Sequence, residues 1–165
     1  MQFLKIPVLL FLISSLFVGC GTSSKKSSSK GSAQSMASSL GDFDVNADSD
    51  SGDAGGIRTV YFPFNSSTLR VNAINSLDIN ADVLKKFPSL RVQVEGHCDE
   101  RGSVQYNLAL GEKRAQSIKD YLVASGVSAD RIATISYGKE RPISLEHNEM
   151  SWSKNRRGNF VIIAK

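Results

Sequence analysis

Residues 21–56 contain almost no large apolar side chains, and this limits where a hydrophobic core can form. Residues 21–40 include nine Ser and three Lys, and residues 41–56 include five Asp and four Gly. A segment of this composition cannot bury enough apolar surface to offset the entropy lost on folding. The sequence therefore predicts a disordered tether over residues 21–56 and one globular domain over residues 57–165.

The first twenty residues have the pattern of an export signal. Lys5 is the only charged residue before an apolar run over residues 6–18. This run is short for a spanning helix and typical of a signal peptide, which we place at residues 1–19. Residues 16–20, Leu-Phe-Val-Gly-Cys, resemble a bacterial lipobox, which implies that Cys20 is lipidated. Acyl chains on Cys20 would anchor the chain in a membrane, and an ordinary secreted protein is the alternative.

Four apolar segments within the expected domain have the pattern of β-strands. In the clearest of them, Leu90, Val92 and Val94 alternate with polar residues, which indicates a strand with one face exposed to solvent. The four predicted strands cover residues 59–64, 90–95, 131–137 and 158–164.

Two further segments have the period of an amphipathic helix. The first begins at a cap among residues 66–68 and ends before Pro88, and the second begins after Ser103 and ends near Gly126. The stripe of the second helix comprises Leu108, Gly111, Ala115, Ile118 and Leu122, where the glycine permits close packing. The order βαβαββ predicts an α/β fold, a two-layer sandwich with two main helices packed on one face of a four-stranded mixed sheet.

Cys98 and the two histidines do not have the arrangement of a catalytic or metal site. His97 is adjacent to Cys98, and neighbouring residues at a strand end point to opposite sides, so they cannot act as nucleophile and base. His147 has no fixed distance to Cys98, and the three residues lack the spacing of zinc ligands. The sequence predicts a protein that is not an enzyme and holds no metal or cofactor, with a thiol hydrolase using Cys98 as the alternative.

Charge is distributed unevenly along the chain. Residues 57–165 carry 16 Lys or Arg and 11 Asp or Glu, a net charge of +5, whereas residues 41–53 carry five Asp. This bias is compatible with an acidic partner, but the export signal and the lack of interleaved aromatic and basic residues argue against nucleic acid. Residues 44–50 lack the turn glycine of a calcium loop, so they are predicted to be a solvated acidic linker.

Four motifs follow one another in the predicted domain: Val94–Gly102, Tyr106–Ala115, Ser136–Pro142 and Lys154–Arg157. Together they resemble the peptidoglycan-associated lipoproteins of the OmpA C-terminal-like family, over about residues 57–165. The resemblance implies a domain that binds peptidoglycan without catalysis, through the diaminopimelate residue of its stem peptide. It also implies an outer-membrane lipoprotein of the Tol-Pal system, with its domain in the periplasm, TolB-like and TolA-like partners, and a role in envelope integrity and cell division.

Diaminopimelate carries both carboxylates and an ammonium group, so a pocket that binds it needs a fixed anion and a fixed cation. By motif position, Asp99 would bind the ammonium group and the planar guanidinium of Arg114 would bind a carboxylate. The resemblance assigns five further ligand-binding residues, which are Phe64, Asn65, Arg101, Asn107 and Leu110.

Position 65 departs from the family pattern, in which Asp is common where this chain has Asn65. The departure keeps open an OmpA-like lipoprotein that acts mainly as a protein-interaction module, with weak or no wall binding. Simpler structural roles also remain open for the candidate residues: Asp99 could cap a turn, Arg114 could pair with a neighbouring carboxylate, Leu110 could belong to the core, and Arg156 and Arg157 could form structural ion pairs.

Overall fold

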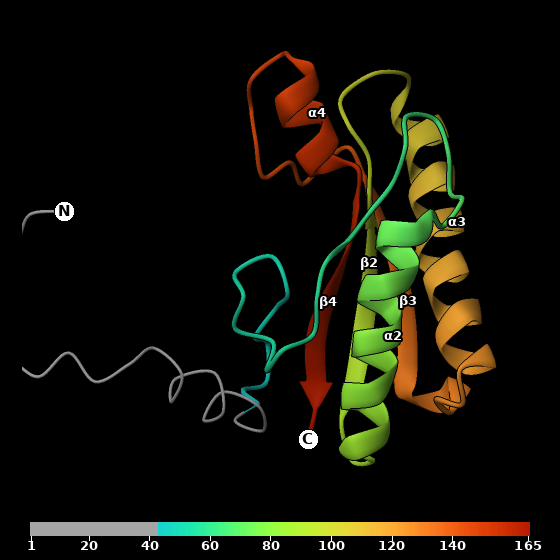
Figure 1. Cartoon of the computed structure of the whole chain (residues 1–165). Coiled ribbons are helices and arrows are strands. Elements are labelled where there is room, and N and C mark those ends of the chain that lie inside the picture. Colours follow the sequence, from blue (N-terminus) through green and yellow to red (C-terminus); the bar gives the residue numbers. More distant parts are fainter. Residues whose placement is uncertain (1–42) are drawn as a thin grey trace, which may run out of the picture. The chain divides into compact units, whose positions relative to one another are not determined.

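The computed structural model describes residues 43–165 (Figure 1). The signal peptide, Cys20 and the part of the expected tether up to residue 42 lie outside the described residues. In chain order the elements are β1 (Val60–Tyr61), α2 (Val71–Lys86), β2 (Arg91–His97), α3 (Val104–Ala124), the 3-10 helix η1 (Ala129–Arg131), β3 (Ile132–Gly138), α4 (Glu149–Asn155) and β4 (Arg157–Ala164).

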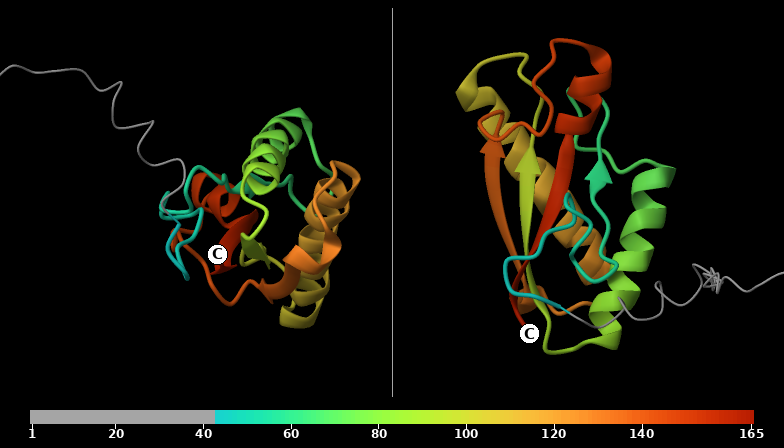
Figure 2. Two further views of the ribbon diagram at one scale, coloured as in Figure 1. Left: turned by 90° about the horizontal axis from the view of Figure 1, so that it is seen from below. Right: turned by 90° about the vertical axis from the view of Figure 1, so that its left-hand side faces the viewer.

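The four strands form one mixed sheet in the order β1-β4-β2-β3. Strands β2 and β3 are parallel, and β4 runs antiparallel to both β1 and β2. Figure 2 shows α2 and α3 covering one face of this sheet. The predicted two-layer α/β sandwich with a four-stranded mixed sheet is therefore confirmed. Within residues 43–165, no helix combines the length and apolar character needed to cross a bilayer.

Helix α3 packs tightly against the sheet at a pair of glycines. A Cβ atom added to Gly111 would lie 2.3 Å from Oγ of Ser136 and 2.7 Å from the carbonyl oxygen of Gly96. The expected role of Gly111 in close packing is thus confirmed. The prediction that Leu108 lies on the buried stripe is wrong: its side chain is exposed, because the buried face of α3 passes through Asn107, four residues before Gly111.

Three local differences from the predicted elements lie near one end of the sheet. Helix α2 begins at Val71, after Arg70, and not at a cap among residues 66–68. Strand β1 is limited to two residues, so a long connection with a turn at Phe64 and Asn65 joins β1 to α2. The loop predicted before the last strand contains helix α4, whose N-cap Asn148 accepts a hydrogen bond from the backbone N–H of Ser151.

Residues 43–56, expected to belong to a disordered tether, pack against the sheet instead. We call this segment the strap. Its backbone pairs with β4 beyond the short β1, with an Asp48–Val161 bridge and hydrogen bonds to both the N–H and the C=O of Ile162. In Figure 1 the strap lies beside β4 on the side of the sheet away from α2 and α3. Phe43 is buried and joins the hydrophobic core through an edge-on contact with Phe87, with ring centres 4.8 Å apart.

The strap also changes the character of the sheet face that was expected to be exposed. Asn159 and Glu95 on that face are buried, and Oγ of Ser49 in the strap donates a hydrogen bond to Oδ1 of Asn159. Arg157 is buried as well and forms an ion pair with Asp50, at 2.6 Å between Nε and Oδ2. Asn159, Glu95 and Arg157 on this face are therefore hydrogen-bonded by the strap or by one another, which explains how they tolerate burial, whereas Nδ1 of His97 has no hydrogen-bond partner among the described residues.

Candidate functional site

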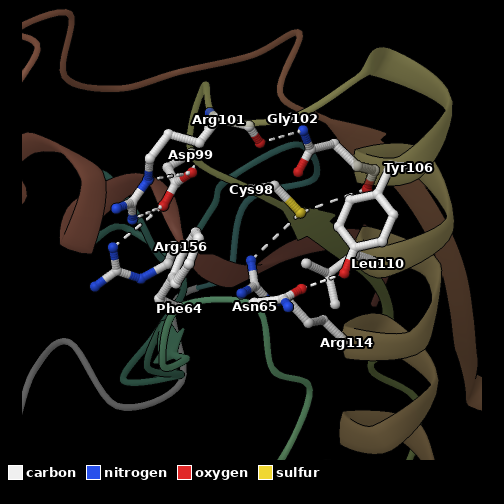
Figure 3. Close-up of a pocket in the computed structure, with 11 residues that line it drawn as sticks. Phe64, Asn65, Cys98, Asp99, Arg101, Gly102, Tyr106, Leu110, Arg114 and Arg156 are labelled. Carbon is white, nitrogen blue, oxygen red and sulfur yellow. Dashed lines mark hydrogen bonds and ion pairs between the residues drawn. The ribbon is translucent and has the colours of Figure 1, made fainter.

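A pocket of about 170 Å³ lies at the end of the sheet where β2 ends and β4 begins. Its walls come from the β1–α2 connection, the β2–α3 loop, the first turns of α3 and the residue that follows α4 (Figure 3). All seven predicted ligand-binding residues line it, namely Phe64, Asn65, Asp99, Arg101, Asn107, Leu110 and Arg114. The other four lining residues are Cys98, Gly102, Tyr106 and Arg156.

Arg114, on α3, is a fully buried cation at the base of this pocket. Its guanidinium donates to the backbone carbonyl oxygens of Ser66 (2.9 Å), Pro63 (3.0 Å) and His97 (2.7 Å), and to Sγ of Cys98 (3.3 Å). It has no ion pair with a carboxylate of residues 43–165, so the alternative of a neighbouring carboxylate partner is wrong. Burial lowers the pKa of Arg114, yet a guanidinium stays protonated in proteins, so Arg114 is a buried positive charge with no ion-paired carboxylate among residues 43–165.

Asp99, at the end of β2, is buried at the side of the same pocket. One oxygen accepts hydrogen bonds from the backbone N–H and Nε of Arg101, and the other from Nη2 of Arg101 (2.6 Å) and Nη1 of Arg156 (3.2 Å). Burial raises the pKa of Asp99, but the hydrogen bonds from the two arginines outweigh it and hold the pKa below its ordinary value. Asp99 is therefore a carboxylate that also caps its own turn.

Arg101 is held on two sides by aromatic rings. Its guanidinium carbon lies 3.9 Å from the ring centre of Phe64 and 4.2 Å from that of Trp152. Trp152 in turn donates from Nε1 to Oε1 of Glu100 at 2.8 Å, and His147 contacts the same carboxylate. Because Phe64, Arg101 and Trp152 belong to three different elements, their contacts tie the β1–α2 connection and α4 to the β2–α3 loop.

The opposite wall is formed by α3 and a strained residue of the β1–α2 connection. Asn65 has a positive φ of 52°, and its side-chain oxygen accepts a hydrogen bond from the hydroxyl of Tyr106. In Figure 3 this hydrogen bond lies beside Arg114 and Leu110. Asn107 is buried and donates to the carbonyl oxygens of Arg101 and Ser103, so it fixes the loop at the mouth of the pocket.

Cys98 and His97 do not form a catalytic pair. The thiol of Cys98 donates to the carbonyl oxygen of Asn107 (3.4 Å), while Nε2 of His97 contacts Glu95 (3.3 Å) on the other side of the strand. Burial raises the pKa of the Cys98 thiol, which disfavours the thiolate that nucleophilic attack requires. The thiol hydrolase alternative is therefore wrong on geometry.

Three residues that shape the site were not predicted to do so. Tyr106 and Arg156 lie within the motifs that carry the family resemblance, which was the only sequence signal available for them. Arg156 was expected to form structural ion pairs, and it does so with Asp99 and Glu149 while also lining the pocket. Trp152 had no signal, because its contact with Arg101 joins residues 51 positions apart.

Comparison with known proteins places the chain in a family. A family model described as "OmpA family" matches residues 61–156. The peptidoglycan-associated lipoprotein of Pseudomonas aeruginosa is 50% identical over 101 residues, which cover 61% of this chain and 60% of that protein, less than two thirds of its length. The peptidoglycan-associated lipoprotein of Rhizobium meliloti is 38% identical over 163 residues, which cover 94% of this chain and 87% of that protein.

Solved structures agree with this placement. The crystal structure of the peptidoglycan-associated lipoprotein from Burkholderia pseudomallei matches with a TM-score of 0.62 and 40% identity, over 64% of this chain and 89% of that one. The C-terminal domain of Helicobacter pylori MotB matches with a TM-score of 0.62 at 21% identity, over 66% of this chain and 86% of that one, and shows a shared fold alone. The named lipoprotein relatives are not enzymes, and neither is this chain. The chain belongs to the OmpA family, and its relatives from Pseudomonas aeruginosa and Rhizobium meliloti are peptidoglycan-associated lipoproteins.

Proposed function

We propose that this chain is an outer-membrane lipoprotein, anchored through a lipidated Cys20, whose periplasmic domain binds peptidoglycan non-covalently through diaminopimelate. The observation that carries the proposal is the meeting of Asp99 and Arg114 in one pocket, although 15 positions separate them in the sequence. The names of the relatives support the same wall-associated role.

The chemistry of the pocket suits an amino acid that carries charges of both signs. Arg114 offers a buried guanidinium with no carboxylate partner among residues 43–165, and Asp99 offers a carboxylate with a lowered pKa. Phe64 and Leu110 add apolar surface for the methylene chain that joins the charged distal end of diaminopimelate to the peptide backbone. A few charge-assisted contacts of about 1.5–3 kcal/mol each give modest affinity. Because the wall is a polymer and the protein is anchored, effective concentration would maintain attachment.

Tethering of the outer membrane to the wall follows from these two attachments. An anchor at Cys20 and a wall-binding pocket in the folded domain would connect the two layers through one chain. We place the protein in the Tol-Pal system, with TolB-like and TolA-like partners and a role in envelope integrity and cell division. The resemblance of its motifs to peptidoglycan-associated lipoproteins supports this assignment.

Co-sedimentation of the full chain, in detergent, with sacculi that contain diaminopimelate tests the proposal. Asp99→Asn and Arg114→Lys should each weaken binding about tenfold or more, since a lost hydrogen bond to a charged group costs about 1.5–3 kcal/mol. The matched controls Asp130→Asn and Arg91→Lys alter an exposed ion pair outside the pocket and should leave binding unchanged. Thermal unfolding confirms that each variant is folded. Unchanged sedimentation of both folded pocket variants would refute the assignment.

A protein-interaction module with weak wall binding is the second candidate, and Asn65 is the observation that favours it. A neutral amide stands where the family pattern that the motifs resemble has Asp, and its oxygen accepts a hydrogen bond from Tyr106. Asn65→Asp separates the two candidates. If the wild-type chain fails to sediment with sacculi and Asn65→Asp restores binding, the interaction module is the correct assignment.

A further inference from the structure

The strap and β1 together line one edge of β4 from its last residues to its first. In the strap, Asn46 donates from its backbone N–H to the carbonyl oxygen of Ile162 at 2.8 Å. The N–H of Ile162 donates to the carbonyl oxygen of Ala47 at 3.0 Å, and the N–H of Ser49 donates to that of Phe160 at 2.9 Å. Strand β1 then pairs with the first two residues of β4, again antiparallel. The N-terminal part of the described chain is therefore paired along the full length of β4.

Side chains reinforce this pairing at both ends of the strap. At its start, Phe43 is buried against Phe87, with ring centres 4.8 Å apart. Nearer the pocket, one carboxylate oxygen of Asp50 accepts from Nε of Arg157 at 2.6 Å, and the other accepts from the hydroxyl of Thr59 at 2.9 Å. The side chains of Asp50 and Arg157 are only 14% and 3% exposed, so water and salt screen their ion pair weakly.

The start of the strap and the pocket lie at opposite ends of β4. The carbonyl oxygen of Phe43 accepts from Nζ of Lys165, just beyond the last residue of β4, whereas Arg156 in the pocket immediately precedes the first. The eight residues of β4 separate these ends by about 26 Å. In Figure 1 the strap begins beside the C-terminal end of β4, and α4 lies at the other end. A body pulled at two points rotates until the line between them follows the pull, so a pull between the N-terminal chain and the pocket acts along β4.

The direction of a pull decides how the strap can leave β4. Hydrogen bonds of an antiparallel pair are perpendicular to the strands, so a pull along β4 loads all of them together in shear. A pull between the strap and the C-terminus acts on two points at the same end, and it opens the bonds one after another. Strand β4 is also paired with β2 along its other edge, so the strap is the partner that detaches.

From this geometry we infer that the strap is a mechanical clamp, which transmits tension between the lipid anchor and the wall-bound pocket to β4 in the direction that its pairing resists best. This inference rests on the proposed function, which supplies the two attachments. Tension has to break the three backbone hydrogen bonds and the Asp50–Arg157 ion pair in one event. Resistance to force is set by the rate of that event, so it is measured as a lifetime under load.

Optical tweezers at constant force, applied to residues 20–165 produced without acyl chains, test the clamp. One handle is attached to the thiol of Cys20. The other is attached either to Gln105→Cys, an exposed position in the first turn of α3 beside the pocket, or to a cysteine added after Lys165. Cys98 is buried and does not couple to a handle in the folded protein.

The two pulling directions should give different lifetimes for the strap at the same force. Detachment of residues 43–56 releases at most about 50 Å of chain, which identifies the event in the extension record. Its lifetime should be about tenfold longer or more when the second handle is at position 105, because two further hydrogen bonds must break in the same step.

Asp50→Asn identifies the strap as the element that carries the load. It should shorten the lifetime in the position-105 direction about tenfold, since a hydrogen bond between charged groups is lost. Asp53→Asn makes the same charge change at an exposed position of the strap that has no ion pair among the described residues, and it should leave the lifetime unchanged. Thermal unfolding verifies that both variants are folded.

Two results overturn the inference. One is an equal strap lifetime in the two pulling directions. The other is a first opening event, in the position-105 direction, whose lifetime Asp50→Asn does not shorten. Sedimentation with sacculi applies no such load and tests the proposed function separately. If sacculi sediment with the wild-type chain while the two lifetimes are equal, only the clamp is wrong. If sacculi do not sediment, the proposed function is wrong whatever the lifetimes.

Discussion

At the scale of single residues, the motif positions predicted which side chains lie together in the candidate site. Asp99 and Arg114 lie in one pocket as expected, because the end of β2 and the second turn of α3 meet where Gly96 contacts Gly111. The hydrogen-bonding state of these residues was not predictable. It depends on Arg101 and Arg156, and no local pattern indicates that both would pair with the same carboxylate.

His97 provides a pH-dependent prediction at this scale. Burial lowers the pKa of His97 below its ordinary value of about 6.5, partly offset by its contact with Glu95, and Arg157 lowers it further. As the pH falls through that ordinary value, the unfolded chain therefore binds a proton that the folded chain does not. The free energy of unfolding should decrease on acidification below about pH 6.5 until the folded pKa is reached.

Denaturant unfolding of the wild-type chain and of His97→Gln at several pH values measures this effect. The variant has no imidazole to protonate, so its stability should decline less over the range just below pH 6.5, even if its stability at pH 7.5 is lower. An equal decline in both proteins would show that His97 is not the group responsible.

At the scale of secondary structure, the periodic elements were well predicted and their ends were not. The capping side chain of Ser103 accepts from the backbone N–H of Tyr106 as expected. Helix α2 starts later than predicted, and the carbonyl oxygens of Pro63 and Ser66 in the connection before it accept hydrogen bonds from Arg114, which hold the connection against the pocket. Such a partner lies about fifty positions away, and neither helix period nor capping preference can reveal it.

A prediction about stability at this scale concerns the close contact between Gly111 of α3 and Gly96 of β2. Gly111→Ala would place a methyl group 2.7 Å from the carbonyl oxygen of Gly96, closer than packed atoms tolerate. Overpacking of this kind costs about 1–3 kcal/mol, so the helix has to shift away from the sheet. The free energy of unfolding from urea titration should fall by that amount. Gln105→Ala, at an exposed position of α3, is the control and should change it by less than about 0.5 kcal/mol.

At the scale of the whole molecule, the strap alters both the domain boundary and the charge balance. Its four Asp residues lie in a segment that packs beside a domain of net charge +5, and Asp50 and Asp44 pair with Arg157 and Lys165. The composition predicted that this segment would not fold, because only Phe43 and Ala54 within it belong to the core and only Ala47 packs against it. Its order depends on the sheet that it covers.

The position of the strap also shows at which end of the domain the N-terminal part of the chain enters, relative to the pocket. Phe43 packs near the C-terminal end of α2, and its carbonyl oxygen accepts from Lys165 at the end of β4. The pocket lies at the other end of β4, next to Arg156. The chain therefore enters the folded domain at the end away from the pocket. If Cys20 is the anchor, the 22 residues from 21 to 42 can span at most about 75 Å between membrane and domain.

Truncation tests whether the strap is part of the domain. A chain that begins at residue 57 should be less stable than one that begins at residue 43. It loses the burial of Phe43, worth about 1.5–3 kcal/mol, and leaves Arg157 buried without Asp50, a further loss of about 1.5–3 kcal/mol. The melting temperature should therefore fall by about 10 °C or more.

The shorter chain should also self-associate, because removal of the strap exposes backbone N–H and C=O groups of β4 around Ile162. Calorimetry and size-exclusion chromatography of the two chains, compared at equal concentration, measure both effects. Equal melting temperatures and equal monomer fractions would mean that the strap contributes nothing to the fold and that the domain begins at residue 57. A lower melting temperature without self-association would show that the strap stabilises the core but is not needed to protect the sheet edge.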